Sequence, residues 1–355
     1  MKSSRILKAL TLTLALTAAS NAFAATATEM LSEDLQAGIK TLSRETRMYH
    51  YFGINLNGKR LEDTNLKKAG KRNEMVQTRV KQAAAQFWDL NNNTTQLANA
   101  GIGLYLAIDP YASSPAAAPD TGANFGSTML EVTFNAGTRY LDLMKDVPLR
   151  DATIQAIISE TGMSQAQAGK LLLPRTEPSG KVSHKGFARD TLQYMAEAQN
   201  TNFRKMVYNV YSQNGIAMTE YGWQAATSAF CGSTTAHRSA LVYVGGPLTQ
   251  NAIKSVTMVF WEPNSAELDA QESEALGRNR KFFSVLQPLR PLEKKYQSTA
   301  DQAYSAKKAG DKATAKQLSA ELPVIMSNIK TTISSVYSDE AEINDLRSKT
   351  FECLK

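Results

Sequence analysis

A tyrosine preceded by two glycines is the feature of this chain best suited to chemistry. Residues 101–109 (GIGLYLAID) place Tyr105 on a short apolar strand, just after Gly101 and Gly103. A loop rich in Ser, Pro and Ala follows, and then two further strand-like runs within 125–143. Glycines let a backbone approach a ligand closely, and a tyrosine face stacks on flat rings. This arrangement predicts a site for a flat ligand beside an exposed tyrosine.

Common catalytic motifs are absent from the sequence. It contains no phosphate-binding GxxxxGK(S/T), no HExxH and no GxSxG, and Gly101-x-Gly103 lacks the third glycine of a dinucleotide-binding fingerprint. An SxxK match at 327–330 lies within a predicted helix and lacks the other motifs of that hydrolase class, so it indicates no nucleophile. With three histidines in the chain, the sequence predicts no histidine-rich metal site.

The first 24 residues have the three parts of a secretory signal peptide. Three basic residues precede an apolar run at 10–19, and Ala-Phe-Ala at 22–24 fits the cleavage rule for small residues. A membrane anchor is the alternative, but a span needs about 20 apolar residues, and this run is shorter. No later segment is long and apolar enough to span a membrane. We therefore expect an exported, soluble chain, in a periplasm or outside the cell.

The net charge of the exported chain gives no indication of nucleic-acid or membrane binding. Removing residues 1–24 takes away three basic residues and no acidic one, so the formal charge falls from +7 to +4. A charge of this size affects only solubility and the weak steering of ligands.

The two cysteines, Cys231 and Cys353, would lie in an oxidising compartment. Their even number indicates one disulfide that ties the C-terminal tail to the main domain, while two unpaired thiols are the alternative. A disulfide needs Cα atoms within about 7 Å of each other, which the sequence does not determine. Neither cysteine has a CxxC spacing or a neighbouring histidine, so we expect no zinc site.

The hydrophobic pattern predicts an α+β domain over residues 25–262. Strands are expected at 47–52, 104–108, 128–134, 139–143, 216–223, 239–244 and 252–261. Helices are expected at 28–46, 73–90, 151–160, 164–172 and 190–211, with Ser164 as the N-cap of the fourth.

The composition changes after Pro263, and residues 263–355 are predicted to form a helical extension. A coiled-coil-like seam with spacings of three and four consists of Leu318, Leu322, Ile325, Ile329, Ile333 and Val336. The expected facing residues are Leu289, Leu292, Tyr296 and Ala303. Gly310 and Asp311 would form the turn of a hairpin, and Pro323 should kink or restart its second helix. The hairpin either packs against the main domain or offers a partner a docking arm through 289–336.

The order of the strands and of their residues resembles the ADP-ribosyltransferase fold, in particular the His-Tyr-Glu branch of diphtheria-type toxins and poly(ADP-ribose) polymerases. In that branch a YHG-type strand is followed by GxGIYFA, a Ser-rich loop, a GxxxLxEVxxG strand and turn, and a late EYxVY strand. Met48-Tyr-His50, residues 101–107 and residues 128–143 resemble the first three of these strand motifs, in the same order. The resemblance covers roughly 47–260 and implies an α+β domain of split antiparallel sheets.

The resemblance implies NAD as the substrate, with cleavage of its nicotinamide–ribose bond through an oxocarbenium-like state. It implies that His50 hydrogen-bonds the ribose and that Tyr105 stacks on the nicotinamide ring. Backbone groups beside the histidine, at Tyr49, would hold the carboxamide, and Gly101 and Gly103 would bring the backbone close to the ligand. A protein that accepts ADP-ribose is the partner that this chemistry implies.

Two positions depart from the family's pattern. Phe125 stands near the place of a second tyrosine, where its ring could stack but not hydrogen-bond. Ser239 stands where the late-strand glutamate is expected, and a serine supplies no negative charge. Glu220 on the preceding strand is the alternative carboxylate. The sequence therefore leaves open an ADP-ribose-transferring or NAD-cleaving enzyme, a degenerate domain that only binds, and an envelope protein whose helical arm docks a partner.

Overall fold

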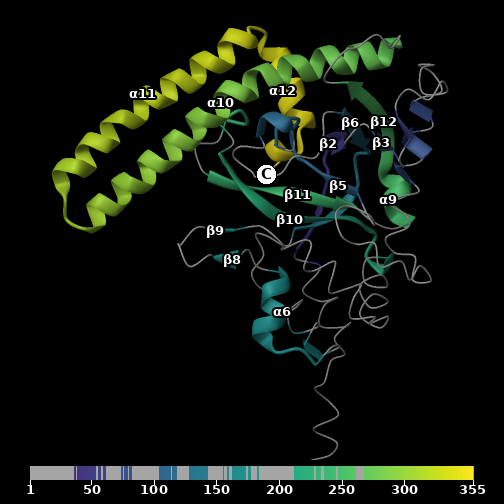
Figure 1. Cartoon of the computed structure of the whole chain (residues 1–355), viewed down its shortest axis with the longest axis horizontal. Coiled ribbons are helices and arrows are strands. Elements are labelled where there is room, and N and C mark those ends of the chain that lie inside the picture. Colours follow the sequence, from purple (N-terminus) through teal and green to yellow (C-terminus); the bar gives the residue numbers. More distant parts are fainter. Residues whose placement is uncertain are drawn as a thin grey trace, which may run out of the picture.

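A five-stranded sheet, a three-stranded sheet and a long helical hairpin dominate the described part of the protein, for which we use a computed structural model (Figure 1). The described residues are 38–52, 104–117, 128–142, 162–172, 212–260 and 268–354, with gaps at 113, 228, 233–235 and 245–246, and short pieces at 36 and within 55–60, 73–81, 155–159 and 175–183. This arrangement confirms a mixed α+β architecture. No helix in these ranges is both long enough and apolar enough to cross a membrane.

The larger sheet has the strand order β1-β7-β10-β11-β5. Its strands are β1 (Ile39–Thr41), β7 (Arg139–Asp142), β10 (Ile216–Thr227), β11 (Ala236–Val244) and β5 (Leu104–Leu106). All neighbouring strands are antiparallel except β7 and β10, which run parallel. The larger sheet is therefore mixed, and the prediction of purely antiparallel sheets is wrong for this pair.

The smaller sheet has the order β12-β6-β2, with both pairs antiparallel. Its strands are β12 (Ile253–Phe260), β6 (Thr128–Phe134) and β2 (Thr46–Phe52). The central strand β6 is buried along its length apart from the half-buried Thr133, so both faces of the sheet are covered. The strands predicted at 47–52 and 128–134 are confirmed to within one residue.

Alternating residues of β2 belong to two hydrophobic clusters on opposite faces of the smaller sheet. The first cluster, shared with the larger sheet, includes Met48, Leu106, Val132, Tyr140 and Met218. The second includes Tyr49, Tyr51, Met129, Ala275 and Leu276. The last two residues lie on helix α10 (Ala270–Lys308), so α10 covers the outer face of the smaller sheet.

The C-terminal part consists of α10, α11 (Lys312–Val336), α12 (Glu340–Lys349) and the 3-10 helix η2 (Phe351–Leu354). Helices α10 and α11 form a hairpin whose far end extends beyond the sheets in Figure 1. Asp269 begins α10 with a capping box to Glu272. Gly310 takes a φ of +83°, which favours glycine, and Asp311 then caps α11. The predicted hairpin and its turn are confirmed.

Helix α11 continues through Pro323, so of the two predicted effects of this proline, a kink or a restart, the restart does not occur. Helix α10 likewise contains Pro288 and Pro291. A proline inside a helix removes a backbone hydrogen bond and costs about 3 kcal/mol, which tertiary packing has to offset. The buried side chains of Leu289 and Ile325, close to these prolines, supply such packing.

The helix predicted over 28–46 is wrong at its C-terminal end. Residues 39–41 form β1, which pairs antiparallel with β7, and β2 begins at Thr46. The apolar spacing in this segment fits a helix, but strand β7 provides hydrogen-bonding partners that a local pattern does not reveal. Ser164 does cap α6 (Gln165–Leu172), as predicted, because its hydroxyl oxygen accepts from the backbone N–H of Gln167.

Shorter elements complete the described chain. They are β3 (Asn55–Leu56), β4 (Lys59–Arg60), η1 (Pro115–Ala117), β8 (Arg175–Thr176), β9 (Val182–Ser183) and α9 (Pro247–Ala252). The helix predicted at 73–90 is present where the structure describes it, within 73–81. The predicted signal peptide at 1–24 and the predicted helix at 190–211 lie outside the described residues.

Candidate functional site

The two sheets meet at an isolated bridge between β2 and the end of β5. The N–H of Tyr49 donates to the carbonyl oxygen of Ala107 at 2.9 Å, and the N–H of Ala107 donates to the carbonyl oxygen of Tyr49 at 2.6 Å. Because β5 also pairs with β11 through residues 104–106, the strands β11, β5 and β2 are consecutive neighbours. We call the place where they meet, at Tyr49 and Ala107, the strand junction.

The strand junction brings the backbones of His50 and Tyr105 together. His50 follows Tyr49 and Tyr105 precedes Ala107 by two residues, so in an antiparallel bridge both lie on the same side of it. Their Cα atoms are therefore within about 10 Å of each other, although by strand alternation position 105 shares the face of Ala107 and position 50 belongs to the opposite face. His50 is half-buried, and strand alternation puts it on the face of Met48, beside the core that the two sheets share.

Tyr49 lies in the core rather than on a ligand-facing surface. Its side chain is 1% exposed and packs with Tyr51 and Ala275 beneath α10. Burial raises the pKa of its hydroxyl well above the usual value, and the nearby Glu131 carboxylate adds to this effect. Both backbone groups of Tyr49 are bonded to Ala107. A carboxamide at the junction would therefore find no free N–H at this residue.

The register of the larger sheet puts the two candidate late-strand residues at different distances from Tyr105. Tyr105 lies opposite Tyr243 of β11, and Tyr243 lies opposite Thr219 of β10. Glu220 follows Thr219, so its Cα is about 10 Å from that of Tyr105, two strand spacings away. Ser239 is four residues from Tyr243, so its Cα is about 14 Å from that of Tyr105. Glu220 is therefore the nearer of the two.

Three further residues of the predicted site, Gly101, Gly103 and Phe125, lie outside the described residues. Where the chain is described, the candidate ligand site consists of His50 and Tyr105 at the strand junction, with Glu220 and Ser239 further across the larger sheet. The same part of the chain holds no group of three His, Cys, Asp or Glu side chains that could bind a metal ion.

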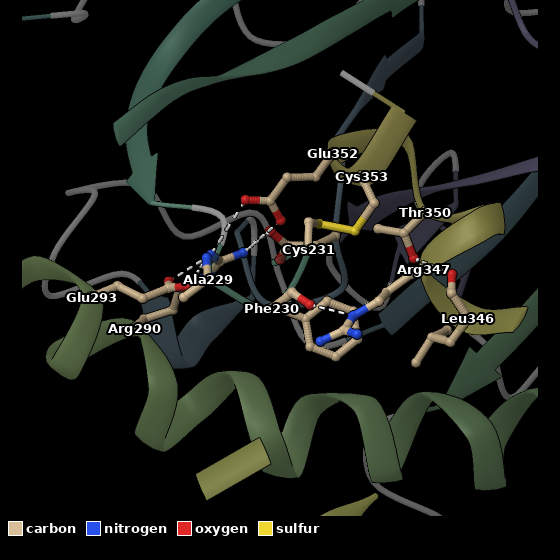
Figure 2. The surroundings of a disulfide bond; sticks show 11 residues. Ala229, Phe230, Cys231, Arg290, Glu293, Leu346, Arg347, Thr350, Glu352 and Cys353 are labelled. Carbon is tan, nitrogen blue, oxygen red and sulfur yellow. Dashed lines mark hydrogen bonds and ion pairs between the residues drawn. A yellow bond between two sulfur atoms is a disulfide. The ribbon is translucent and has the colours of Figure 1, made fainter. Parts of the chain in front are cut away.

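A buried group of charged side chains includes Asp109, which is two residues beyond Ala107. Figure 2 shows most of its members. Arg290 of α10 bonds Asp109 Oδ2 at 2.5 Å, Glu293 Oε2 at 2.8 Å and Glu352 Oε2 at 3.0 Å. The side chain of Arg290 is 12% exposed, and those of the three carboxylates are 1–2% exposed. We call these four residues the Arg290 cluster.

Within the Arg290 cluster, burial and the neighbouring opposite charges shift the pKa values of the side chains in opposite directions. Burial disfavours the charged form of Arg290, yet the three carboxylates hold its pKa well above the usual value. Burial raises the pKa of Glu352 to about 7 in spite of Arg290, and Asp109 and Glu293 add to the rise. Burial also raises the pKa of Glu293. Three ionised carboxylates around one guanidinium would leave an excess negative charge in a dry site, so the cluster tends to hold a proton.

The predicted disulfide joins Cys231 to Cys353 beside this cluster, with Cα atoms 5.0 Å apart. In Figure 2 the disulfide lies next to Glu352, which precedes Cys353 on η2. The Nε of Arg347 donates to the carbonyl oxygen of Phe230 at 2.5 Å. The C-terminal tail is therefore fixed to the loop after β10 by a covalent bond and by a hydrogen bond. This pairing confirms the predicted disulfide.

Asp109 connects the Arg290 cluster to the end of β5. Its Oδ1 accepts from the backbone N–H groups of residues 111–112, both at 2.8 Å, while its Oδ2 accepts from Arg290. From the other side, the hydroxyl of Tyr51 on β2 donates to the carbonyl oxygen of Pro110. The turn after the strand junction is thus held by both β2 and α10.

Sequence reasoning missed the Arg290 cluster because its members are far apart in the chain. Asp109 and Arg290 are separated by 181 residues. One signal was present, because Glu293 falls on the helical stripe of Leu286 and Leu289, at spacings of seven and four residues. A carboxylate on the apolar face of a helix indicates a buried partner.

A second buried carboxylate, Glu131, joins β6 to α10. It accepts from Arg278 Nη2 at 2.6 Å and from Asn279 Nδ2 at 2.7 Å, and Arg47 Nε lies 3.6 Å away. The side chain of Glu131 is 4% exposed, and the residue lies opposite Tyr49 in the smaller sheet. Helix α10 therefore supplies charged partners both to the smaller sheet and to the turn after β5.

Comparisons with known proteins assign no family to the chain. No protein-family model matches it, and neither does any curated protein or solved structure.

Proposed function

We propose that this protein binds NAD at the strand junction, in an exported domain that resembles the ADP-ribosyltransferases. The observation that supports this proposal is the bridge between Tyr49 and Ala107, which makes β11, β5 and β2 consecutive neighbours across two sheets. The resemblance requires such an arrangement, because the histidine strand, the tyrosine strand and the late strand have to meet around one ligand. Their order along the chain does not by itself require it.

The proposed roles follow the resemblance residue by residue. Tyr105 stacks on the nicotinamide ring, and His50 hydrogen-bonds the ribose. Gly101 and Gly103 let the backbone approach the ligand, and Phe125 adds a second stacking face. Because Tyr49 has no free backbone N–H, the carboxamide is held by other backbone groups near the end of β2.

Cleavage of the nicotinamide–ribose bond is the reaction proposed for bound NAD. The C–N bond breaks, its electron pair leaves with nicotinamide, and water or a protein nucleophile adds to the ribose carbon and releases a proton. A carboxylate near the ribose stabilises the positive charge that develops. Glu220 is the better candidate for this role, because it is nearer to Tyr105 in the strand register than Ser239 and because a serine hydroxyl carries no charge.

Titration of the mature protein with NAD tests the binding proposal. His50→Ala and Tyr105→Ala should each weaken binding by about tenfold, since a stacked ring or a hydrogen bond contributes about 1.4 kcal/mol. Tyr304→Ala is the matched control, because Tyr304 is 69% exposed on α10, towards the hairpin turn. Tryptophan fluorescence reports binding, and thermal unfolding shows whether each variant is folded. A wild-type protein that binds no NAD at millimolar concentration would refute the proposal.

Release of nicotinamide, measured chromatographically, separates catalysis from binding. If Glu220 stabilises the transition state, Glu220→Gln abolishes release and leaves the affinity for NAD near the wild-type value. Ser239→Ala then changes neither quantity. The reverse pattern would assign the role to Ser239, and binding without release by the wild type indicates a domain that only holds NAD.

The exposed hairpin supports a second candidate function, that of a non-catalytic envelope protein that docks a helical partner through residues 289–336. Tyr304 and Val324 are 69% and 62% exposed, the highest values among the large apolar side chains of the described residues, and both belong to the hairpin. This function predicts that a photo-crosslinker at position 304 captures one envelope protein, that Val324→Asp prevents the capture, and that NAD does not bind.

A further inference from the structure

The three carboxylates of the Arg290 cluster are not equally satisfied. Asp109 accepts from Arg290 and from both N–H groups of residues 111–112. Glu293 accepts from Arg290 and from one backbone N–H at 2.8 Å. Glu352 accepts two bonds from Arg290, at 3.4 and 3.0 Å, which are the longest bonds in the cluster, and among the described residues it accepts from no backbone N–H. Glu352 is therefore the carboxylate that loses least when it takes up a proton.

Asp109 and Glu352 both accept from the same nitrogen atom of Arg290, which has one N–H for each of them. Arg290 Nη2 donates to Asp109 Oδ2 at 2.5 Å and to Glu352 Oε2 at 3.0 Å. An ionised Glu352 attracts this nitrogen and repels the Asp109 carboxylate across a space that excludes water. A protonated Glu352 has neither effect, so the bond between Arg290 and Asp109 is then no longer weakened by a second full negative charge. The charge on Glu352 consequently affects the turn that Asp109 caps.

We propose that the Arg290 cluster is a proton-responsive latch that sets how firmly the turn after β5 is held against α10. The latch is tight when Glu352 carries a proton and looser when it does not. Arg290 and Asp109 are positioning residues for the strand junction, because Ala107 of that junction is two residues before Asp109. The effect of the latch on the turn does not depend on the proposed function. Its effect on NAD binding rests on the proposed function.

The charges that face Glu352 belong to two elements. Arg290 and Glu293 lie on α10, Asp109 lies in the turn after β5, and the neighbouring disulfide is uncharged. Burial raises the pKa of Glu352 from 4.5 to about 7. Because the folded protein holds this proton more tightly than the unfolded chain, the stability linked to it falls as the pH rises from 4.5 to about 7 and is constant above that range. The latch is therefore tight near pH 6 and loose near pH 8.5.

Hydrogen–deuterium exchange of the mature chain tests the latch, with Glu352→Gln as the neutral isostere. At pH 6 the variant and the wild type should exchange alike in residues 106–112. At pH 8.5 the wild type should exchange about tenfold faster than the variant, and comparison at equal pH removes the intrinsic pH dependence of exchange. Glu340→Gln, the same change at an exposed position of α12, is the control and should follow the wild type at both pH values.

Equal exchange of the wild type and of Glu352→Gln at both pH values would overturn the proposal. A difference at pH 8.5 that is confined to residues 350–354 would overturn it as well, because Glu352 would then act on the tail without reaching the turn. The comparison stays informative if Glu352→Gln changes overall stability, since a purely structural effect shifts exchange at pH 6 and pH 8.5 alike.

NAD titrations at the same two pH values test the link to the strand junction. The affinity of the wild type should fall between pH 6 and pH 8.5, and that of Glu352→Gln should not. If exchange of residues 106–112 changes with pH but the affinity for NAD does not, the positioning role of Arg290 and Asp109 is overturned. If NAD binds neither protein at either pH, the proposed function fails, and the exchange data still decide whether the latch exists.

Discussion

Removal of the disulfide between Cys231 and Cys353 should lower the free energy of unfolding by about 3–5 kcal/mol. The bond closes a loop with a sequence separation of 122 residues. A loop of this length removes about 16 cal/mol/K of entropy from the unfolded chain, or about 4.9 kcal/mol at 25 °C. We expect the measured value to lie below this limit, because unfolded chains retain compact structure that the disulfide does not have to restrict.

The native contacts of the tail should survive the loss of the bond. Phe351 is fully buried in the core that the two sheets share, and its ring meets the ring of Tyr140 edge-on at 5.3 Å. Thr350 forms a bridge with Arg47 of β2, and Glu352 bonds Arg290. These contacts keep η2 docked, so the change in stability reports mainly on the unfolded chain.

Urea unfolding measures this change by circular dichroism and tryptophan fluorescence. Three samples are needed, namely the oxidised wild type, the reduced wild type and the double variant Cys231→Ala with Cys353→Ala. The reduced wild type and the double variant should coincide, which shows that the effect comes from the cross-link and not from the sulfur atoms. A loss of less than about 1 kcal/mol would refute the chain-entropy argument for this loop.

Two further pairs of variants test the buried contacts, each against an exposed control. Phe351→Ala should destabilise the protein by about 3–5 kcal/mol, because its ring is fully buried, whereas Val324→Ser on the exposed hairpin should change stability by no more than about 0.5 kcal/mol. Glu131→Gln should cost about 3 kcal/mol, since Arg278 loses the carboxylate that it bonds at 2.6 Å, whereas Glu274→Gln, with a side chain that is 79% exposed, should cost almost nothing. Urea unfolding measures all four variants, and similar values within either pair would contradict the burial described above.

The strands were predictable because their signal is local. Residues 128–134 form a run rich in β-branched and apolar side chains, which is typical of strands, and β6 has the same bounds. The segment 39–41 was not predictable in the same way. Its apolar spacing also fits a helix, and only β7, about a hundred residues further along, makes it a strand.

The strand junction was predictable only as far as the order of the strands. His50, Tyr105 and the late strand follow one another in the chain as the resemblance requires. Which side chains of β2 are buried, however, depends on the face that α10 covers. Tyr49 and Tyr51 are buried because α10 covers that face of β2. No pattern within the sequence of β2 shows which of its two faces a distant helix will cover.

The helical extension positions the candidate site and is not only a separate docking arm. Helix α10 supplies Arg278 to the buried Glu131 of β6 and Arg290 to Asp109 at the end of β5. These two ion pairs lie on either side of the bridge that joins the sheets, since Glu131 is opposite Tyr49 and Asp109 is two residues after Ala107. If α10 moved away, Asp109 would lose Arg290 and Glu131 would keep only Arg47 of β2, 3.6 Å away, which costs several kcal/mol. The position of α10 and the geometry of the strand junction are therefore coupled, and the protonation of Glu352 is a means by which the solution pH can act on both.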